Sequence, residues 1–189
     1  VRLLETILSE ARRLADCDAG SLYLVEESGV DRMLHFKLTQ NDSVVVPFKE
    51  ARLPLTSESL CGYVALTGEE LNIADAYEIS VSQPYVFNRS FDDKVGYRTR
   101  SLLVLPMSDH KGRVIGVLQF INRRGNAAEE AAVVPFDDEV TELLRAVASQ
   151  AAVAIQKNDL LRQINELFES FVQASVKAIE QRDPSTSGH

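Results

Sequence analysis

The sequence is short of basic residues. Its 189 residues contain 20 lysines and arginines against 28 aspartates and glutamates, a formal net charge of −8. A protein that binds nucleic acid through its phosphates needs clustered Lys and Arg. Here the tight basic groups are short, such as Arg98 with Arg100 and Arg123 with Arg124. We therefore expect no nucleic-acid partner.

Cysteine and long apolar runs are also scarce. No run approaches the ~18 apolar residues that cross a bilayer, and Arg2 interrupts the N-terminus, which argues against a signal peptide. Cys17 and Cys61 make no disulfide framework. We expect reduced thiols in a cytoplasmic protein with no membrane partner. Because the first residue is Val, we also expect the sequence to be a piece of a longer protein.

What is present predicts one globular domain with an appendage. Hydrophobic periodicity and turn signals predict an α+β fold with an antiparallel sheet. The expected elements are a helix over 3–15, strands over 21–25, 32–38 and 44–46, a helix capped by Ser57 and closed by Gly68, a strand over 71–73, a loop with one short helix over 76–96, strands over 101–107 and 114–122, and a helix from Asp137 to Gln181.

The last helix is long, about 45 residues or roughly 68 Å, and it contains no Gly or Pro. Two seven-residue series that start at Val140 and Leu144 follow coiled-coil spacing, and Asn158 and Asn165 lie in one of them. A second apolar stripe competes for the seam. This pattern predicts a parallel homodimer through the C-terminal helix. The alternative is that its first half packs on its own domain and its second half on whatever follows.

Three ordered blocks resemble a GAF domain of the type found in cyclic-nucleotide phosphodiesterases and adenylyl cyclases. They are 60–77 (LCGYVALTGEELNIADAY), 93–106 (DKVGYRTRSLLVLP) and 114–122 (VIGVLQFIN). The resemblance covers about residues 1–157. It implies a six-stranded antiparallel sheet with helices on both sides, and a small-molecule pocket on the sheet face covered by residues 76–96. A loop-and-helix lid over a rigid sheet fits such a pocket.

The resemblance also implies a set of ligand-binding residues by motif position: Ser21, Phe36, Leu60, Cys61, Asn88, Asp92, Val95, Thr99 and Gln119. Two positions depart from the family pattern. Val95 stands where nucleotide-binding members carry Thr, and Gln119 stands where some carry an acid. A lost hydroxyl beside a phosphate removes a hydrogen bond of ~1–3 kcal/mol. A cyclic nucleotide, another small ligand and no ligand therefore all stay open.

The family's structural latch, an Asn-basic pair followed by Phe and two acids, is partly present. Asn122, Arg123 and Phe136 match it. Val140 and Thr141 stand where the acidic pair would fall, so a residue within 137–139 could supply the acid for Arg123. The latch would tie the last strand to the long helix.

The end of the chain, 178–189 (AIEQRDPSTSGH), resembles the start of an HD-type phosphohydrolase domain of the HD-GYP kind, which hydrolyses cyclic di-GMP. The resemblance implies that His189 begins a metal-binding set in a full-length parent enzyme. One His cannot hold a catalytic metal. We therefore expect this chain to have no catalytic residue, no resident cofactor and no enzymatic activity.

Together these features predict a sensor domain over 1–157, a linker and dimerisation helix over 158–182, and the truncated start of an HD-GYP domain over 183–189. We expect a small-molecule-sensing input module of a bacterial signalling protein whose missing part is a metal-dependent HD-GYP phosphodiesterase. The alternative is a ligand-free dimerisation and signal-transmission module.

Overall fold

The computed structural model describes residues 2–28, 31–125 and 132–182. It divides into two units, Val1–Val153 and Ala154–His189. The first unit holds the sheet and its flanking helices. The second consists, within the described residues, of the later turns of the last helix. His189 and the rest of 183–189 lie outside the described residues, so the expected start of an HD-GYP domain does too.

The centre of the first unit is an antiparallel sheet in the order β3-β2-β1-β6-β5-β4. Its strands are β1 (Cys17–Ser28), β2 (Asp31–Asn41), β3 (Ala51–Pro54), β4 (Leu71–Ile73), β5 (Leu102–Ser108) and β6 (Val114–Arg124). A two-residue strand, β7 (Val133–Val134), pairs with the end of β6. The six-stranded antiparallel sheet and the α+β class are as expected from the sequence.

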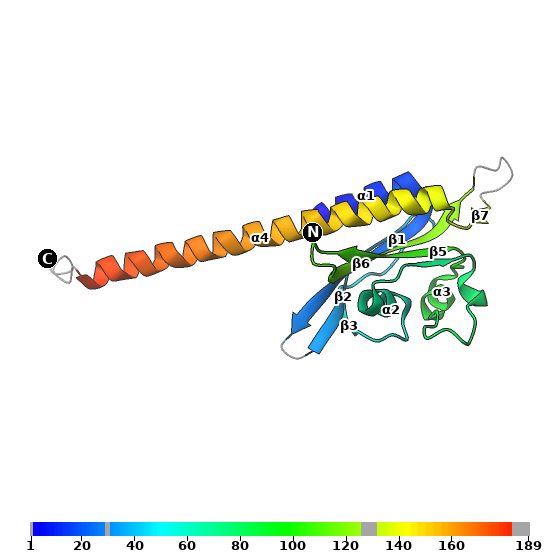
Figure 1. The fold of residues 1–189 in the computed structure, drawn as a ribbon, viewed down its shortest axis with the longest axis horizontal. Coiled ribbons are helices and arrows are strands. Elements are labelled where there is room, and N and C mark those ends of the chain that lie inside the picture. The colour runs from blue at the N-terminus through cyan, green and yellow to red at the C-terminus, as the bar shows by residue number, and fades with distance from the viewer. Residues whose placement is uncertain (1, 29–30, 126–131, 183–189) are drawn as a thin grey trace. The chain divides into compact units, whose positions relative to one another are not determined.

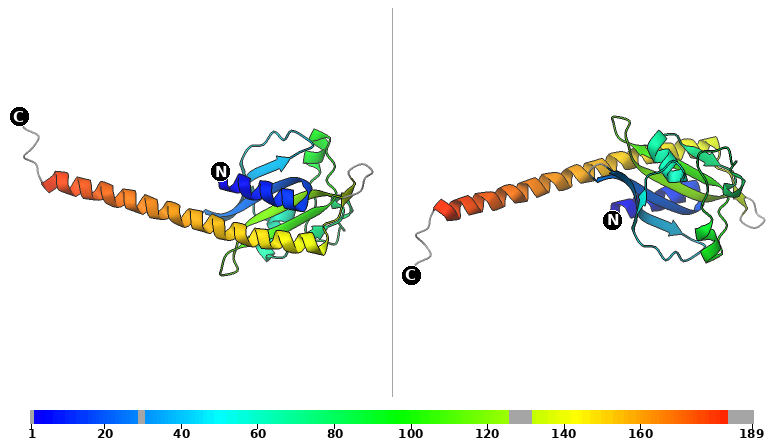
Figure 2. Two further views of the ribbon diagram at one scale, coloured as in Figure 1. Left: turned by 90° about the horizontal axis from the view of Figure 1, so that it is seen from above. Right: turned by 90° about the horizontal axis from the view of Figure 1, so that it is seen from below.

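Helices cover both faces of this sheet (Figure 1). The helix α1 (Arg2–Ala15) and the first turns of α4 (Asp138–Arg182) lie on one face, as the views of Figure 2 also show. Apolar side chains at helical spacing are buried on both helices, for example Leu8 and Ala15 on α1 and Leu144 and Ala148 on α4. Burial on both faces explains why residues 102–105 of β5 are all fully buried.

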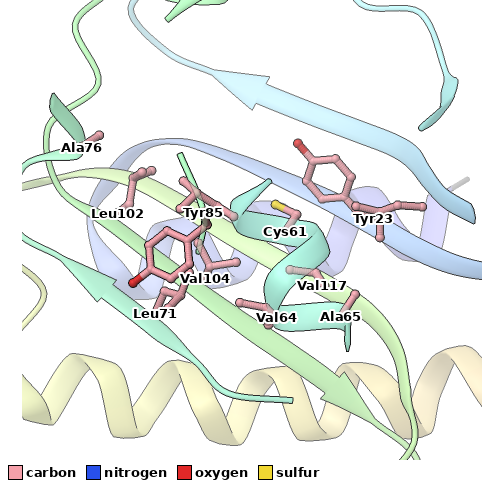
Figure 3. Close-up of a cluster of buried hydrophobic side chains, with 12 residues drawn as sticks. Tyr23, Cys61, Val64, Ala65, Leu71, Ala76, Tyr85, Leu102, Val104 and Val117 are labelled. Atoms are coloured by element: carbon pink, nitrogen blue, oxygen red, sulfur yellow. The ribbon is translucent and has the colours of Figure 1, made fainter. Parts of the chain in front are cut away.

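The other face carries α2 (Leu60–Thr67), the 3-10 helix η1 (Ala76–Glu78) and α3 (Ser90–Val95). A hydrophobic cluster joins α2 to the sheet: Cys61, Val64 and Ala65 of the helix face Val104 of β5 and Val117 of β6 (Figure 3). We call residues 74–100 the lid, because they connect β4 to β5 across this face. The lid is mostly loop, as predicted, but it holds two short helices, η1 and α3, where one was expected.

One predicted strand and one predicted helix cap are wrong. Residues 44–46 form no strand, because the Asn41 side chain accepts hydrogen bonds from the backbone N–H groups of Ser43 and Val44 and turns the chain. The strand that pairs with β2 comes later, at β3. The α2 cap is also two residues later than predicted: Ser59, not Ser57, accepts from Gly62 N at 3.0 Å, whereas Gly68 closes the helix with a φ of 74°.

The break after α1 also differs from the prediction. The expected helix ends at residue 15 and the expected strand begins at residue 21, but Asp16, with a φ of 47°, makes the turn and β1 begins at Cys17. Residues 19–22 pair with β2 on one side and β6 on the other, so sheet pairing overrides the local turn signal. Gly20 is suited to this place because a Cβ there would approach Leu8 and Arg12 of α1 to about 3 Å.

The helix α4 matches its prediction closely, from Asp138 to Arg182. Asp137 caps it by accepting a hydrogen bond from Val140 N at 2.9 Å. In the second unit, nine large apolar side chains on this helix are exposed: Leu160, Leu161, Ile164, Leu167, Phe168, Phe171, Val172, Val176 and Ile179. None of the helices in the described part of the chain is long and apolar enough to cross a membrane.

Candidate ligand-binding cavity

A cavity of about 360 Å³ lies between the lid and the sheet. The strands β1, β2 and β6 supply its floor, α2 closes one side, and the lid segment 86–92 lies over it. Ligand pockets of proteins begin at about 300 Å³, so this volume suits a small molecule. The cavity is on the sheet face where the sequence placed a pocket.

Eight of the nine residues that the sequence singled out line this cavity: Ser21, Phe36, Leu60, Cys61, Asn88, Asp92, Thr99 and Gln119. Val95, at the end of α3, is not among the lining residues. The structure therefore brings together strand, helix and lid positions that are up to 98 residues apart in the chain (Ser21 to Gln119).

Sequence reasoning missed further lining residues, notably Tyr23, Thr39, Phe87 and Phe91. Tyr23 could have been found, because residues two apart on a strand share a face and Ser21 was already a candidate. Thr39 could not. The register of β1 with β2 shifts between Leu22 and Tyr23, and this irregularity lets Phe36 and Thr39, three positions apart, face one cavity.

The floor of the cavity is a row of three uncharged polar side chains. Ser21 of β1 pairs with Thr39 of β2 on one side and with Gln119 of β6 on the other. The hydroxyls of Ser21 and Thr39 lie 3.1 Å apart, and Thr39 donates to the carbonyl oxygen of Gly20 at 3.2 Å. Either hydroxyl can be the donor of the first contact, so the two side chains are hydrogen-bonded to each other and to the backbone of β1.

Two ionisable groups on the floor and wall are held neutral. Burial raises the pKa of the Cys61 thiol to about 12, and burial also raises the pKa of Tyr23 well above its ordinary value. The structure shows Cys61 and Cys17 as free, buried thiols. A thiol that stays protonated near neutral pH is a poor nucleophile, so Cys61 serves as wall, not as a reactive group.

Among the described residues, Asp92 is the one acid that lines the cavity, and both of its carboxylate oxygens accept hydrogen bonds from the protein. It is 2% exposed. One carboxylate oxygen accepts from Thr99 Oγ1 at 2.9 Å, and the other accepts from Thr99 N at 2.8 Å and from the Tyr77 hydroxyl at 2.9 Å. Asp92 thereby ties α3 to η1 and to the chain entering β5. It fixes the lid rather than offering a free charge to a ligand.

A second set of contacts ties the lid to the strand ends. Tyr97 donates to one oxygen of Asp18 at 2.7 Å, while Ser43 and Arg124 donate to the other at 2.7 and 2.8 Å. Burial acts to raise the pKa of Asp18, but these three hydrogen bonds outweigh it and lower that pKa. Burial, followed by the hydrogen bond to Asp18, raises the pKa of Tyr97.

The residues predicted as a latch lie next to this network. Asn122, with a φ of 55°, accepts from Arg100 N at 2.7 Å and donates to Arg98 O at 2.8 Å. Arg123 donates to Asp137, the residue that caps α4, at 2.7 Å. Phe136 is buried, and its carbonyl accepts from Asn72 at 2.9 Å. These contacts join the ends of β4 and β6 to the start of α4.

Among residues 2–28, 31–125 and 132–182, no group of three or more His, Cys, Asp or Glu is arranged to hold a metal ion. The remaining metal candidate, His189, is outside those ranges. The cavity therefore offers shape, hydrogen-bonding groups and apolar walls, which is the chemistry of a binding site.

The comparisons with known proteins agree with this geometry. A family model for the GAF domain matches residues 1–155. A cGMP-specific 3',5'-cyclic phosphodiesterase of Drosophila melanogaster is 30% identical over 178 residues, which are 90% of this chain and 14% of that protein. The chain thus spans a small part of the length of this relative.

Two solved structures share the fold. The GAF domain/HD domain protein from Geobacter sulfurreducens superposes with a TM-score of 0.61 at 18% identity, over 84% of this chain and 93% of that one. The GAF-B domain of DevS from Mycobacterium smegmatis gives a TM-score of 0.58 at 18% identity, over 86% and 97%.

Proposed function

The chain belongs to the GAF domain family, and from that premise we propose that it is the small-molecule-sensing input module of a bacterial signalling protein. GAF domains are regulatory modules, and the relatives here include a cyclic-nucleotide phosphodiesterase. The observation that carries the proposal is the cavity of about 360 Å³ between a polar sheet floor and a lid pinned by Asp92.

The arrangement also suggests how occupancy would reach the rest of a protein. Thr99 lines the cavity and donates a hydrogen bond to Asp92. Tyr97, two residues earlier, donates to Asp18, and Asn122 of β6 donates to the carbonyl oxygen of Arg98 between them. Arg123, the next residue, pairs with Asp137 at the start of α4. A ligand that binds more tightly to one position of the lid increases the population of that position, and these contacts pass the change to the start of α4.

Thermal unfolding with a panel of cyclic AMP, cyclic GMP, cyclic di-GMP and uncharged metabolites tests the sensor proposal. A compound at 100 times its dissociation constant stabilises the fold by ~2.7 kcal/mol. Ser21→Phe, which fills the floor of the cavity, is expected to abolish the shift. If no compound stabilises the wild type, the ligand-free alternative, a module for dimerisation and signal transmission, takes its place.

We propose further that the chain forms a parallel homodimer through α4. Nine large apolar side chains are exposed between residues 160 and 179, too many for an isolated helix in water. A second copy of the same helix would cover them by coiled-coil packing. This surface also supports the ligand-free alternative, because a dimerisation module needs it equally.

The parent protein is proposed to continue as an HD-GYP phosphohydrolase, with residues 1–157 as the sensor, 158–182 as the linker helix and 183–189 as the enzyme's first residues. The support is the resemblance of 178–189 to the start of that domain, together with the fold shared with a GAF domain/HD domain protein. His189 would ligate metal only in that parent. Metal analysis and cyclic di-GMP hydrolysis by the full-length protein, with His189→Ala as the control, test this assignment.

A further inference from the structure

The charge of the cavity lining is informative. Among the described residues, no Lys, Arg or His lines the cavity, and the one charged side chain there, Asp92, is negative. Its three hydrogen bonds leave its charge uncompensated by any cation in the lining. A phosphate brought into this space would lose its water and meet a buried carboxylate instead of a counter-ion, which is costly.

The helix α3 does not supply the missing positive charge. It is six residues long and carries Asp92 and Asp93 in its first turn. Acids at this end neutralise the partial positive charge of a helix N-terminus. The whole chain adds to the effect with its net charge of −8. The cavity therefore disfavours anions both locally and at long range.

One polar side chain of the floor lacks a protein partner. Gln119 is 9% exposed, and its side-chain amide has no hydrogen bond to any residue in the described ranges. Its neighbours on the floor, Ser21 and Thr39, are occupied with each other and with Gly20. Its polar atoms are open to the cavity, since the one fully buried side-chain polar atom without a partner in the described part of the chain is Arg12 Nε. The side chain offers one acceptor and two donors to whatever enters the cavity.

The walls are aromatic. Tyr23 and Phe36 lie stacked, with ring centroids 4.5 Å apart and an interplanar angle of 17°. Phe87 and Phe91 line the cavity from the lid. Aromatic walls favour a flat, apolar-faced ligand. An amide on the floor requires that the edge of this ligand present a donor beside an acceptor.

We propose that the cavity selects a planar, uncharged ring with a hydrogen-bond donor and acceptor side by side on one edge, paired with the amide of Gln119, and rejects the anionic cyclic nucleotides. Nucleobases, nucleosides and other cyclic amides share this edge. The proposal rests on the sensor function proposed above and narrows its ligand class.

Isothermal titration of the chain with matched pairs tests this selection. Guanosine against cyclic GMP, and adenosine against cyclic AMP, share base and sugar and differ in the anionic phosphate; hypoxanthine tests the free base. At least one uncharged compound is expected to bind, and at least tenfold more tightly than the cyclic nucleotide of its pair.

Gln119→Met keeps the length of the side chain and removes the amide. It is expected to weaken the binding of the uncharged compound at least tenfold. The unfolding temperature is expected to stay close to that of the wild type, because the amide lines the cavity and makes no hydrogen bond to another residue in the described ranges. Gln83→Met, the same change at an exposed lid position outside the cavity lining, is the matched control and is expected to bind as the wild type does.

The outcomes separate the two proposals. A cyclic nucleotide that binds as tightly as its nucleoside, or an uncharged compound that binds Gln119→Met as well as the wild type, overturns the selection and leaves the sensor function standing. If none of guanosine, adenosine and hypoxanthine binds, the proposed selection is overturned as well. The sensor function is overturned only if the wider panel of compounds also fails to raise the unfolding temperature.

Discussion

The hydroxyl of Tyr97 donates a 2.7 Å hydrogen bond to the carboxylate of Asp18, and the two residues are 79 positions apart in the chain. Tyr97 follows the helix α3 of the lid, whereas Asp18 lies near the start of β1. The same hydroxyl accepts from Asn122 at 3.0 Å. The hydroxyl of Tyr97 therefore connects the end of the lid to the first strand and to the end of β6.

Tyr97→Phe removes the hydroxyl and its two hydrogen bonds and keeps the aromatic ring. We expect a loss of about 1.5–3 kcal/mol in the free energy of unfolding, because the lost hydrogen bond is to a charged group. Urea denaturation measures it. Tyr85→Phe is the control, since Tyr85 is buried and Tyr97 is half-buried, but the Tyr85 hydroxyl has no hydrogen bond within the described residues. Equal losses in both variants would contradict the role given to the Tyr97–Asp18 bond.

Acid should weaken the fold through the same carboxylate. The pKa of Asp18 is below its unfolded value of 3.8, so its stabilisation is complete above about pH 5 and is lost as the pH falls through 3.8 towards the folded pKa. The pKa of Asp42 is lowered as well, first by its hydrogen bond from Arg12, and acts in the same direction.

Urea midpoints measured between pH 6 and pH 3 check this dependence. The wild type is expected to keep its stability between pH 6 and about pH 5 and to lose it progressively below that. Asp18→Asn should start lower, because the buried amide replaces a carboxylate that accepts three hydrogen bonds, and should then lose less with acid. A variant with the same pH slope as the wild type would show that Asp18 does not contribute.

Asp92 gives a prediction for the lid. In Asp92→Asn, an amide nitrogen would face donors that now bond a carboxylate oxygen. We expect a loss of about 1–3 kcal/mol in stability and faster hydrogen exchange of the Thr99 amide, which is now bonded to Asp92. Asp93→Asn, at the exposed neighbouring position, should change neither. An unchanged hydrogen-exchange rate at the Thr99 amide in Asp92→Asn would contradict the claim that Asp92 holds the lid in place.

The exposed apolar side chains of α4 between residues 160 and 179 give a prediction for the oligomeric state. Leu167→Asp with Phe171→Asp places charge on two apolar side chains that are 71% and 68% exposed in the single chain. We expect light scattering to show a dimer for the wild type and a monomer for the double variant. Gln173→Asp adds a charge at an exposed polar position of the same helix and should remain dimeric. A monomeric wild type would contradict the proposed dimer.

The local sequence pattern was enough to predict much of the fold. Periodicity found α1, α4 and the β5–β6 hairpin, because each of these elements buries an apolar face that the sequence displays directly. It failed at residues 44–46, where three β-branched residues suggested a strand but the Asn41 side chain turns the chain first. It failed also at Asp16, because pairing on both sides of β1 decides where that strand begins.

The cavity was predictable only in part. Motif position located the floor and lid residues, including Gln119 and Asp92. The contribution of Thr39 depends on the register shift in β2, and the Tyr97–Asp18 contact depends on the full sheet order, neither of which a local pattern encodes. That Gln119 lacks a partner is likewise a property of the assembled floor.

The most direct test of the sensor account is a nuclear magnetic resonance titration that follows the side-chain amide of Gln119 and the backbone amide of Thr99. The account predicts that at least one of guanosine, adenosine and hypoxanthine shifts both resonances saturably, and that cyclic GMP and cyclic AMP at the same concentration shift them far less. Resonances that stay fixed with guanosine, with cyclic GMP and with every compound of the wider panel would contradict a ligand site in this cavity.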